Sequence, residues 1–311
     1  AAADLITAYD SAGISNLGDE AITLSDTSLT AAVLNTLDGN TSGTIDATAI
    51  TTLTGAAADL ITAYDSAGIS NLGNEAVSVS SGTASTSQAN TLAAATSGIV
   101  TATISDGDLA TLAGLTETGN AYSITISDTS VDAAALNTLD GKTTIAIDAN
   151  AITTLTGAAA DLNTAYAANG SSITGLGNEA ATLSDTTLAV SVLNTLDGNT
   201  SGTVNANTVT TLTGAAADLN TAYASGGISN LGNEAVTLSD TTLAVSVLNT
   251  LDGNTSGTID ASNITTLTGS ASDLITAYTS GGITGLANEA VTLSDTTLAA
   301  SVLNTLDGNT S

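Results

Sequence analysis

The sequence predicts an α/β fold: a repeat solenoid in which parallel strands stack and strand–helix steps alternate. Three observations support this prediction. The chain repeats itself every 55 residues, each repeat contains segments that alternate apolar and hydroxyl residues, and apolar residues at helical spacing follow each such segment. We therefore expect one continuous solenoid over residues 1–311, with a divergent unit at about 76–130.

The internal repeat is visible in three phrases. Leu-Ser-Asp-Thr-Thr-Leu begins at Leu183, Leu238 and Leu293. Leu-Asn-Thr-Leu-Asp-Gly begins at Leu34, Leu136, Leu193, Leu248 and Leu303. Thr-Ala-Tyr ends at Tyr9, Tyr64, Tyr166, Tyr223 and Tyr278. In repeat proteins each unit is one supersecondary element that buries its apolar face only by stacking on its neighbours.

The first strand of a repeat is expected at Ala235–Asp240. Val236 and Leu238 share one face, and hydroxyl residues occupy the other. In the divergent unit the same alternation predicts strands over 100–105 and 122–127. We predict that these segments are half-buried strands whose Thr and Ser side chains face the solvent.

A helix is expected directly after each first strand. Leu243, Val247 and Leu251 recur every four residues. Ser239 and Asp240 are residue types that cap helix N-termini, so we predict that they begin this helix. Asp-Gly at 252–253 is expected to end it, with the glycine in the left-handed conformation.

The second strand–helix step is expected to be shorter. A strand is predicted over Thr258–Ala261. One helical stripe is then predicted through Ile264, Leu267, Ala271, Leu274 and Tyr278. Gly269 interrupts this stripe and is expected to kink or split the helix.

The order strand, helix, strand, helix shows no hairpin signal, which predicts parallel pairing with right-handed crossovers. Eleven candidate strands lie between Ala21 and Asp295. The alternative is a pure parallel β-helix, because Thr and Val favour strands. Helices are favoured because the Leu/Val spacing after each Ser-Asp is four rather than two.

Composition excludes several classes of function. The chain has 30 acidic residues and one cation, Lys142, with no His, Cys, Met, Trp, Phe or Pro. Disulfides, Cys/His zinc sites and His-dependent nucleophiles are therefore excluded. A net charge of −29 opposes binding to nucleic acid and to anionic membranes. No apolar run is long enough for a transmembrane helix, and from the first residues we expect no signal peptide.

One recurring segment resembles a metal site. Residues 252–260 match the EF-hand calcium loop at positions 1, 3, 5 and 9 for oxygen ligands, position 6 for glycine and position 8 for an apolar residue. Residues 38–46 and 197–205 match in the same way. The predicted ligands of these three weak calcium loops are Asp38, Asn40, Ser42 and Asp46; Asp197, Asn199, Ser201 and Asn205; and Asp252, Asn254, Ser256 and Asp260.

The match fails at position 12, where Ala49, Thr208 or Asn263 replaces the bidentate acid. A simpler interpretation is that Asp-Gly ends a helix and the following residues turn the chain into the next strand. No cofactor other than calcium is expected. In the divergent copy Lys142 replaces the Asn, so that loop should not bind calcium, whether the ammonium stands in for a metal or is a surface residue.

Catalysis is not expected. The Ser-Asp pairs at 25/26, 127/128, 184/185, 239/240 and 294/295 lack a His or Lys base, so we interpret them as helix caps. The adjacent acids Asp19 and Glu20 could suggest glycoside hydrolysis. Later copies replace the Asp by Asn, as at Asn233, so the pair is not repeated. The sequence predicts that the protein is not an enzyme.

The phrases above, together with Gly-Asn-Glu-Ala-Val-Thr-Leu-Ser-Asp and Thr-Gly-Asn-Ala-Tyr, resemble repeats of giant acidic cell-surface proteins of marine cyanobacteria. Such proteins often accompany RTX-type, type I-secreted adhesins. The resemblance covers essentially the whole chain and implies an extracellular location with a structural or adhesive role. The glycine-rich RTX nonapeptide is absent from this sequence.

Together these observations predict a non-catalytic extracellular repeat protein that forms part of a long cell-surface fibre, filament or adhesin stalk. The expected partners are other copies of the chain, through end-to-end or lateral stacking, or other cell-surface components. The alternative is a binding module whose Thr/Ser faces or acidic loops hold carbohydrate, ice or calcium. The sequence begins inside a second helix and stops before a second strand, so we expect it to be a window of a longer array.

Overall fold

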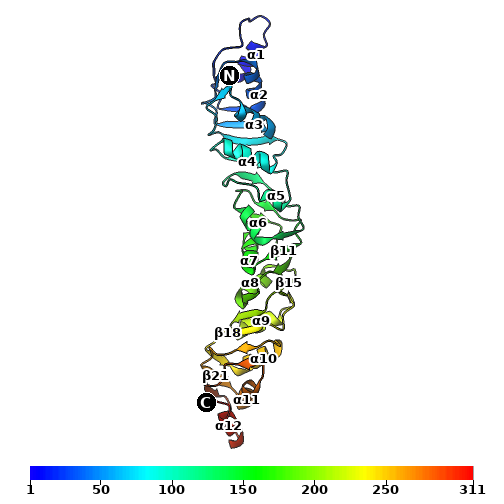
Figure 1. Cartoon of the computed structure of the whole chain (residues 1–311), viewed down its shortest axis with the longest axis vertical. Helices are drawn as coiled ribbons and strands as arrows, with labels where there is room; N and C mark the ends of the chain where they lie inside the picture. The colour runs from blue at the N-terminus through cyan, green and yellow to red at the C-terminus, as the bar shows by residue number, and fades with distance from the viewer. Residues whose placement is uncertain (311) are drawn as a thin grey trace. The chain divides into compact units, whose positions relative to one another are not determined.

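The computed structural model describes residues 1–310, which fall into two compact units. Unit 1 comprises residues 1–129, 135–152 and 168–175, and unit 2 comprises residues 130–134, 153–167 and those from 176 on. Short strands and helices alternate throughout the colour gradient of Figure 1. Every sheet in both units is purely parallel, as the sequence predicts.

Unit 1 contains three sheets. The largest has the order β2-β4-β6-β7-β8, and the others have the orders β1-β3-β5 and β10-β12. Their strands are β1 (Ile22–Thr23), β2 (Ser28–Thr30), β3 (Ile45–Asp46), β4 (Thr52–Ala56), β5 (Ile69–Ser70), β6 (Ala76–Ser81), β7 (Val100–Thr103), β8 (Ala121–Ser123), β10 (Ile147–Asp148) and β12 (Ile173–Thr174).

Unit 2 also contains three sheets, with the orders β17-β15-β13-β11-β9, β14-β16-β18-β20-β22 and β19-β21-β23. Their strands are β9 (Ser130–Asp132), β11 (Thr154–Gly157), β13 (Ala180–Leu183), β14 (Thr187–Ala189), β15 (Val204–Asn205), β16 (Thr211–Gly214), β17 (Ile228–Ser229), β18 (Ala235–Leu238), β19 (Thr242–Ala244), β20 (Ile259–Asp260), β21 (Thr266–Gly269), β22 (Ile283–Thr284) and β23 (Ala290–Leu293).

Twelve helices are seen in residues 1–310, and all are short. They are α1 (Ala2–Tyr9), α2 (Ala31–Asn40), α3 (Ala57–Asp65), α4 (Thr86–Ala95), α5 (Leu109–Leu112), α6 (Ala133–Asp140), α7 (Ala159–Ala168), α8 (Val190–Asn199), α9 (Ala216–Ala224), α10 (Val245–Asn254), α11 (Ala271–Thr279) and α12 (Ala300–Asp307). The prediction that helices follow strands is therefore confirmed over the pure β-helix alternative.

The strands pair at a nearly constant step along the chain. In unit 2, Thr211 pairs with Ala235 and Val236 pairs with Ile259, so neighbouring strands of one sheet lie about 24 residues apart. We call the stretch of chain covered by one such step a coil. Each coil holds one helix, and α8 to α12 contact one another in succession. The 55-residue repeat holds two coils of unequal length: one has two strands before its helix and covers about one such step, and the other is longer because it has three strands, as β17, β18 and β19 before α10.

The core lies inside the coils and is built almost entirely from Leu, Ile, Val and Ala. Val236 and Leu238 point inward and are buried, whereas Thr237 between them is partly exposed. Tyr122 is the largest fully buried side chain. The alternation predicted from sequence therefore sets which face of each strand is covered.

The predicted start of the first helix is wrong. After β18 the chain adds the short strand β19, and α10 begins only at Val245 with Ala244 as its N-cap residue. Asp240 therefore precedes a strand rather than a helix. The predicted end is wrong as well: Gly253 lies inside α10, does not have a positive φ, and is followed by the extended C-cap residue Thr255.

The predicted second helix is only half right. Its first part, Thr266–Gly269, is strand β21, and α11 begins at Ala271. Gly269 has a φ of +152°, which allows the chain to turn directly from strand to helix. Because the Thr-Leu-Thr-Gly segments and the three-residue segments such as β19 are strands, residues 1–310 hold 23 strands, not the predicted 11.

Candidate functional site: polar junctions between coils

A buried glutamate recurs along the chain: Glu75, Glu179, Glu234 and Glu289 are 0% to 8% exposed, whereas Glu20 is partly buried. Glu234 is fully buried in the turn before β18. Its Oε2 atom accepts hydrogen bonds from the N–H groups of Gly232 at 2.8 Å and Asn233 at 3.2 Å, and from the Tyr223 hydroxyl at 3.1 Å. Three donors therefore hold one oxygen of this carboxylate, whereas its Oε1 atom is buried without a hydrogen-bond partner.

The same pairing recurs in both units. The hydroxyl of the Thr-Ala-Tyr tyrosine, at the end of one helix, donates to a glutamate that precedes one of the following strands. The carboxylate pairs are Tyr9–Glu20 at 3.2 Å, Tyr64–Glu75 at 2.9 Å and Tyr278–Glu289 at 3.2 Å. In the copy at Tyr166 the hydroxyl instead reaches the backbone oxygen of Glu179 at 3.5 Å.

A threonine and a glycine from the next coil close the junctions at Glu20, Glu75, Glu179 and Glu234. The hydroxyl of Thr255 donates to the backbone oxygen of Glu234 at 3.0 Å and accepts from the N–H of Gly257 at 2.9 Å. Gly257 packs directly on that carbonyl, and a Cβ atom there would overlap it. The junction therefore requires glycine for its close approach.

Burial changes the acidity of these groups. Desolvation raises the pKa of Tyr166 to about 12, and desolvation together with the charge of Glu289 raises the pKa of Tyr278 to about 12. At the more exposed copy the N–H of Gly18 lowers the pKa of Glu20. The phenol therefore remains protonated as a donor and the carboxylate of Glu20 ionised as an acceptor at neutral pH.

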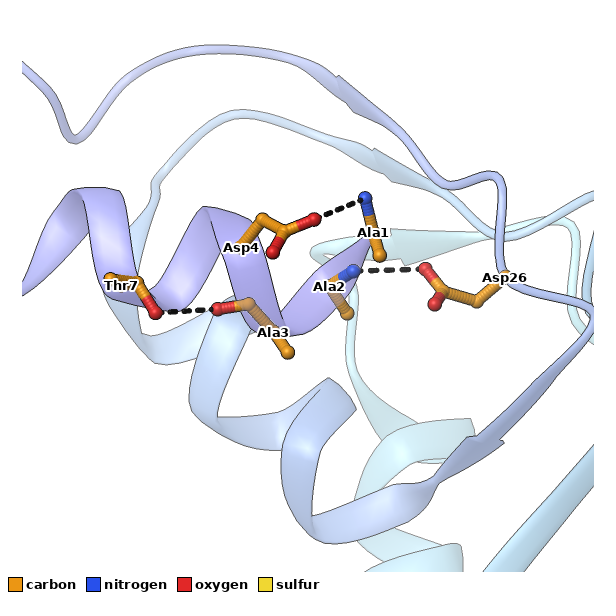
Figure 2. Close-up of polar contacts among 6 residues, drawn as sticks. All are labelled: Ala1, Ala2, Ala3, Asp4, Thr7 and Asp26. Carbon is orange, nitrogen blue, oxygen red and sulfur yellow. Dashed lines mark hydrogen bonds and ion pairs between the residues drawn. The ribbon is translucent and has the colours of Figure 1, made fainter.

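A second junction links a strand end to a helix in the preceding coil. The Oδ2 atom of Asp240 accepts from the N–H of Ala216, the first residue of α9, at 2.8 Å. Figure 2 shows the equivalent contact, in which Asp26 accepts from the N–H of Ala2 at 2.9 Å. The other copies join Asp106 to Thr86, Asp128 to Leu109, Asp185 to Ala159 and Asp295 to Ala271.

These contacts correct the interpretation of the Ser-Asp pairs. The aspartates do cap helices, as predicted, but each caps a helix whose first residue lies 19 to 26 residues earlier in the chain rather than the helix that follows. A carboxylate at a helix N-terminus satisfies a free N–H and interacts favourably with the helix dipole. The cap therefore fastens one coil to the next.

A third junction uses the Asp-Gly aspartate. The Oδ2 atom of Asp252 in α10 accepts from the Ser280 hydroxyl at 2.7 Å, and Gly282 packs against its Oδ1 atom. The corresponding pairs are Asp38–Ser66 at 2.7 Å, Asp197–Ser225 at 2.7 Å and Asp140–Ser172 at 2.8 Å. The first residue of each predicted calcium loop thus has a partner in the next coil.

The other predicted ligands have hydrogen-bond partners of their own. Asn254 donates to the Asn220 side chain at 2.9 Å, Ser256 donates to the Gly232 backbone, and Asp260 lies in β20 and accepts from the N–H of Ser262 at 3.0 Å. The equivalent residues Asn199, Ser201 and Asn205, and Ser42 and Asp46, hold corresponding places. The side chain of Asn40 has a buried nitrogen without a partner.

Among residues 1–310, no group of three or more Asp or Glu side chains is placed to hold a metal ion. The calcium loops stay a prediction. Lys142 donates to the backbone oxygen of Thr116 at 2.9 Å, outside its own loop. Over the same residues, the structure shows no helix with the length and apolar content needed to cross a membrane.

Outward-facing hydroxyl residues form rows across the sheets. In unit 1, Thr30, Thr54, Ser78 and Thr101 are paired in register on neighbouring strands. In unit 2, Thr156, Thr182, Asn205 and Ser229 make a similar row. Adjacent members of a row are separated by about 4.8 Å, the spacing between strands.

Comparison with known proteins gives no relative: no protein-family model, curated protein or solved structure matches this chain. The Tyr–Glu junction was not predicted from the sequence. Its signal is the separation of 11 residues between the tyrosine of Thr-Ala-Tyr and the next glutamate, as between Tyr223 and Glu234, which holds in every copy except Tyr166–Glu179, where it is 13. The function must therefore be argued from these junctions alone.

Proposed function

We propose that this chain is a non-catalytic structural repeat protein, an α/β solenoid that forms part of an extracellular cell-surface fibre, filament or adhesin stalk. The observation that carries the proposal is the use of the polar groups. Glu234, Asp240 and Asp252 each have hydrogen-bond partners within the repeat, and two of them reach another coil. Side chains that are held by such hydrogen bonds stiffen a scaffold.

Chemistry supports the same conclusion. The acidic groups of the junctions face hydroxyl and N–H donors, whereas acid–base catalysis needs a group poised to exchange a proton with a substrate. The hydroxyl groups lack the base that would activate a nucleophile, because the sequence has no His and its single Lys bonds to a backbone oxygen. A junction that recurs along the chain is better suited to holding neighbouring coils together than to forming a single active site.

The solenoid is tested by solution scattering of the 311-residue chain. An array of stacked coils gives a pair-distance distribution with one maximum at short distance and a long tail. A symmetrical distribution, as from a compact globule, would contradict the proposal. A second signature is unfolding in more than one step, because solenoid stability is a sum over neighbouring units.

The location is tested by immunogold labelling of intact cells of the source organism. Label on surface fibres supports the proposal, and label confined to the cytoplasm contradicts it. Proteinase K is the suitable enzyme for shaving such fibres, because trypsin has only Lys142 to cleave after.

A binding module is the second candidate, and the hydroxyl rows are the observation that favours it. The row from Thr30 to Thr101 presents uncharged hydroxyl groups at regular spacing on one sheet. Such a face suits a neutral ordered ligand, such as carbohydrate or ice. Saturable binding to either, lost when Thr54 and Thr101 are replaced by Lys, would support this function.

A further inference from the structure

A cavity lies between helices α3 and α4 in unit 1. Its volume is about 380 Å³, which falls in the usual range of small-molecule sites. Its apolar wall includes Ile61, Ile69, Leu72 and Leu92, of which Leu92 is fully buried and the other three are half-buried. Such a wall suits the hydrocarbon part of a small ligand.

The cavity arises from two differences between this copy of the repeat and the copies in unit 2. Ile61 of α3 and Ala95 of α4 line the cavity. The corresponding residues in unit 2 are asparagines whose side chains hydrogen-bond to each other across the two helices. These pairs are Asn163–Asn199 and Asn220–Asn254, both at 2.9 Å. Because alanine is smaller and neither residue of this copy can make the bond, the space taken by the amide pair is left open.

The copy at α1 and α2 carries only one of the two changes. Ile6 stands in the place of Ile61, but Asn40 keeps the amide, and its side-chain nitrogen is buried without a hydrogen-bond partner. A buried polar group without a partner is costly. Ala95 removes that amide where Ile61 is present, so the two changes together give an open space with a consistently apolar wall.

The open side of the cavity attracts positive charge. Asp65 ends α3 and Ala95 ends α4, so the C-terminal ends of two helices lie at the cavity. Carbonyl groups at a helix C-terminus carry partial negative charge, and cations are stabilised near them. Among the described residues that line the cavity, Asp65 is the only one with a charged side chain, and it is exposed. In α9 the corresponding residue is Ala224.

We propose that this cavity binds a small organic cation, an amine whose apolar body packs against Ile61 and Ile69 and whose ammonium group lies beside Asp65. Tyr64 adds an aromatic residue to the wall, and its hydroxyl is held by Glu75 at 2.9 Å. A cation close to an aromatic face gains a further attraction. The site belongs to this one copy of the repeat, because the sequence combines the isoleucine and the alanine only here.

Titration of the 311-residue chain with benzylamine, followed by backbone amide chemical shifts, tests the proposal. Benzylamine carries an ammonium group at neutral pH, and benzyl alcohol is its neutral analogue. We expect benzylamine to shift the amide signals around Ile61 and Ala95 in a saturable way, and to bind about fivefold more tightly than benzyl alcohol at low salt. Asp65→Asn should make the affinities of the two probes about equal.

The repeat supplies matched variants. Ile61→Asn combined with Ala95→Asn restores the amide pair of the unit 2 copies, so this variant should fold while its cavity is filled and the saturable shifts are lost. Ile6→Asn makes the same single change beside the unpartnered Asn40. It should leave benzylamine binding unchanged.

Three results would overturn the proposal. The first is the absence of saturable shifts around the cavity, with small shifts spread over acidic residues along the chain, which would reduce the effect to attraction by the net charge of −29. The second is saturable binding that persists in the folded double variant. The third is equal binding of the two probes by the parent chain, which would remove the cation from the assignment. Asp65→Asn, at an exposed side chain, keeps the test decisive if the double variant is misfolded.

Discussion

The carboxylate of Asp240 caps helix α9 by accepting a hydrogen bond from the N–H of Ala216 at 2.8 Å, although the two residues lie 24 positions apart. A helix cap is usually local, because the capping side chain belongs to the residue that begins the helix. Here the cap comes from the next coil and so couples a helix terminus to the stacking of strands. The same contact recurs at Asp26 and Ala2.

Removing this cap should loosen α9. We expect Asp240→Ala to cost about 1 kcal/mol locally, the usual value of an N-cap, and Asp240→Asn to cost less because the amide oxygen still accepts the bond. The measurement is amide hydrogen exchange in α9, where the Ala variant should speed exchange about fivefold. Ser239→Ala is the matched control at an exposed neighbour. Equal exchange in the Ala variant and its control would disprove the capping role.

Two glycines that are four residues apart should respond in opposite directions to the same substitution. A Cβ atom at Gly257 would overlap the backbone oxygen of Glu234, whereas a Cβ atom at Gly253 meets nothing within 4 Å inside α10. We expect Gly257→Ala to lower the melting temperature. Gly253→Ala should stabilise α10 by up to about 1 kcal/mol, because alanine is the better helix former.

The control is built into this pair. If Gly253 had the left-handed conformation that its position in Asp-Gly suggests, its replacement by Ala would destabilise the protein instead. Thermal melts of the two variants beside the parent chain therefore decide both points. A neutral Gly257→Ala would show that the Thr255–Glu234 junction is looser than the structure has it.

The α/β class could be predicted from the sequence, because apolar residues recur every two positions in strands and about every four in helices. The prediction was wrong where one segment fits both spacings. Ile264, Leu267 and Ala271 fit a helical stripe by spacing alone, yet Leu267 belongs to a strand that ends at Gly269. The glycine was the only local sign of the break, and a lone glycine is also tolerated inside helices.

The junctions were less predictable still, because their partners lie far apart in sequence. Nothing near Asp240 indicates Ala216, and nothing near Asp252 indicates Ser280. The register of the strands brings each pair together, and register follows from the stacked fold as a whole. The EF-hand pattern at Asp252 predicts that the ligands gather within one loop. In the structure, the side chain of Asp252 instead bonds to Ser280 in the next coil.

The buried tyrosines should make the fold sensitive to alkali. Burial, aided by the charge of Glu117, raises the pKa of Tyr122 to about 12, and burial raises the pKa of Tyr166 to about 12, against 10.0 in the unfolded chain. A raised pKa means that the folded state holds the proton more tightly. This stability is complete below pH 10 and is lost as the pH rises toward 12.

The measurement is the absorbance of tyrosinate at 295 nm during a pH titration, followed beside circular dichroism. Tyr122→Phe should remove one late-titrating phenol and leave the others in place. Titration of all six tyrosines near pH 10 in a chain that is still folded would contradict the burial of these side chains.

The role of Asp252 can be separated from metal binding by its response to a chelator. Because its carboxylate receives the Ser280 hydroxyl at 2.7 Å, we expect Asp252→Ala to destabilise the chain by about 1 kcal/mol in calcium and in chelator alike. Asp252→Asn should cost less, since it keeps an acceptor for the serine.

The measurement is a thermal melt of each variant at fixed ionic strength, with and without calcium. A ligand that binds only the folded state must raise the melting temperature. A calcium-dependent rise in the parent chain, abolished when Asp38, Asp197 and Asp252 are all replaced by Ala, would instead establish these loops as metal sites.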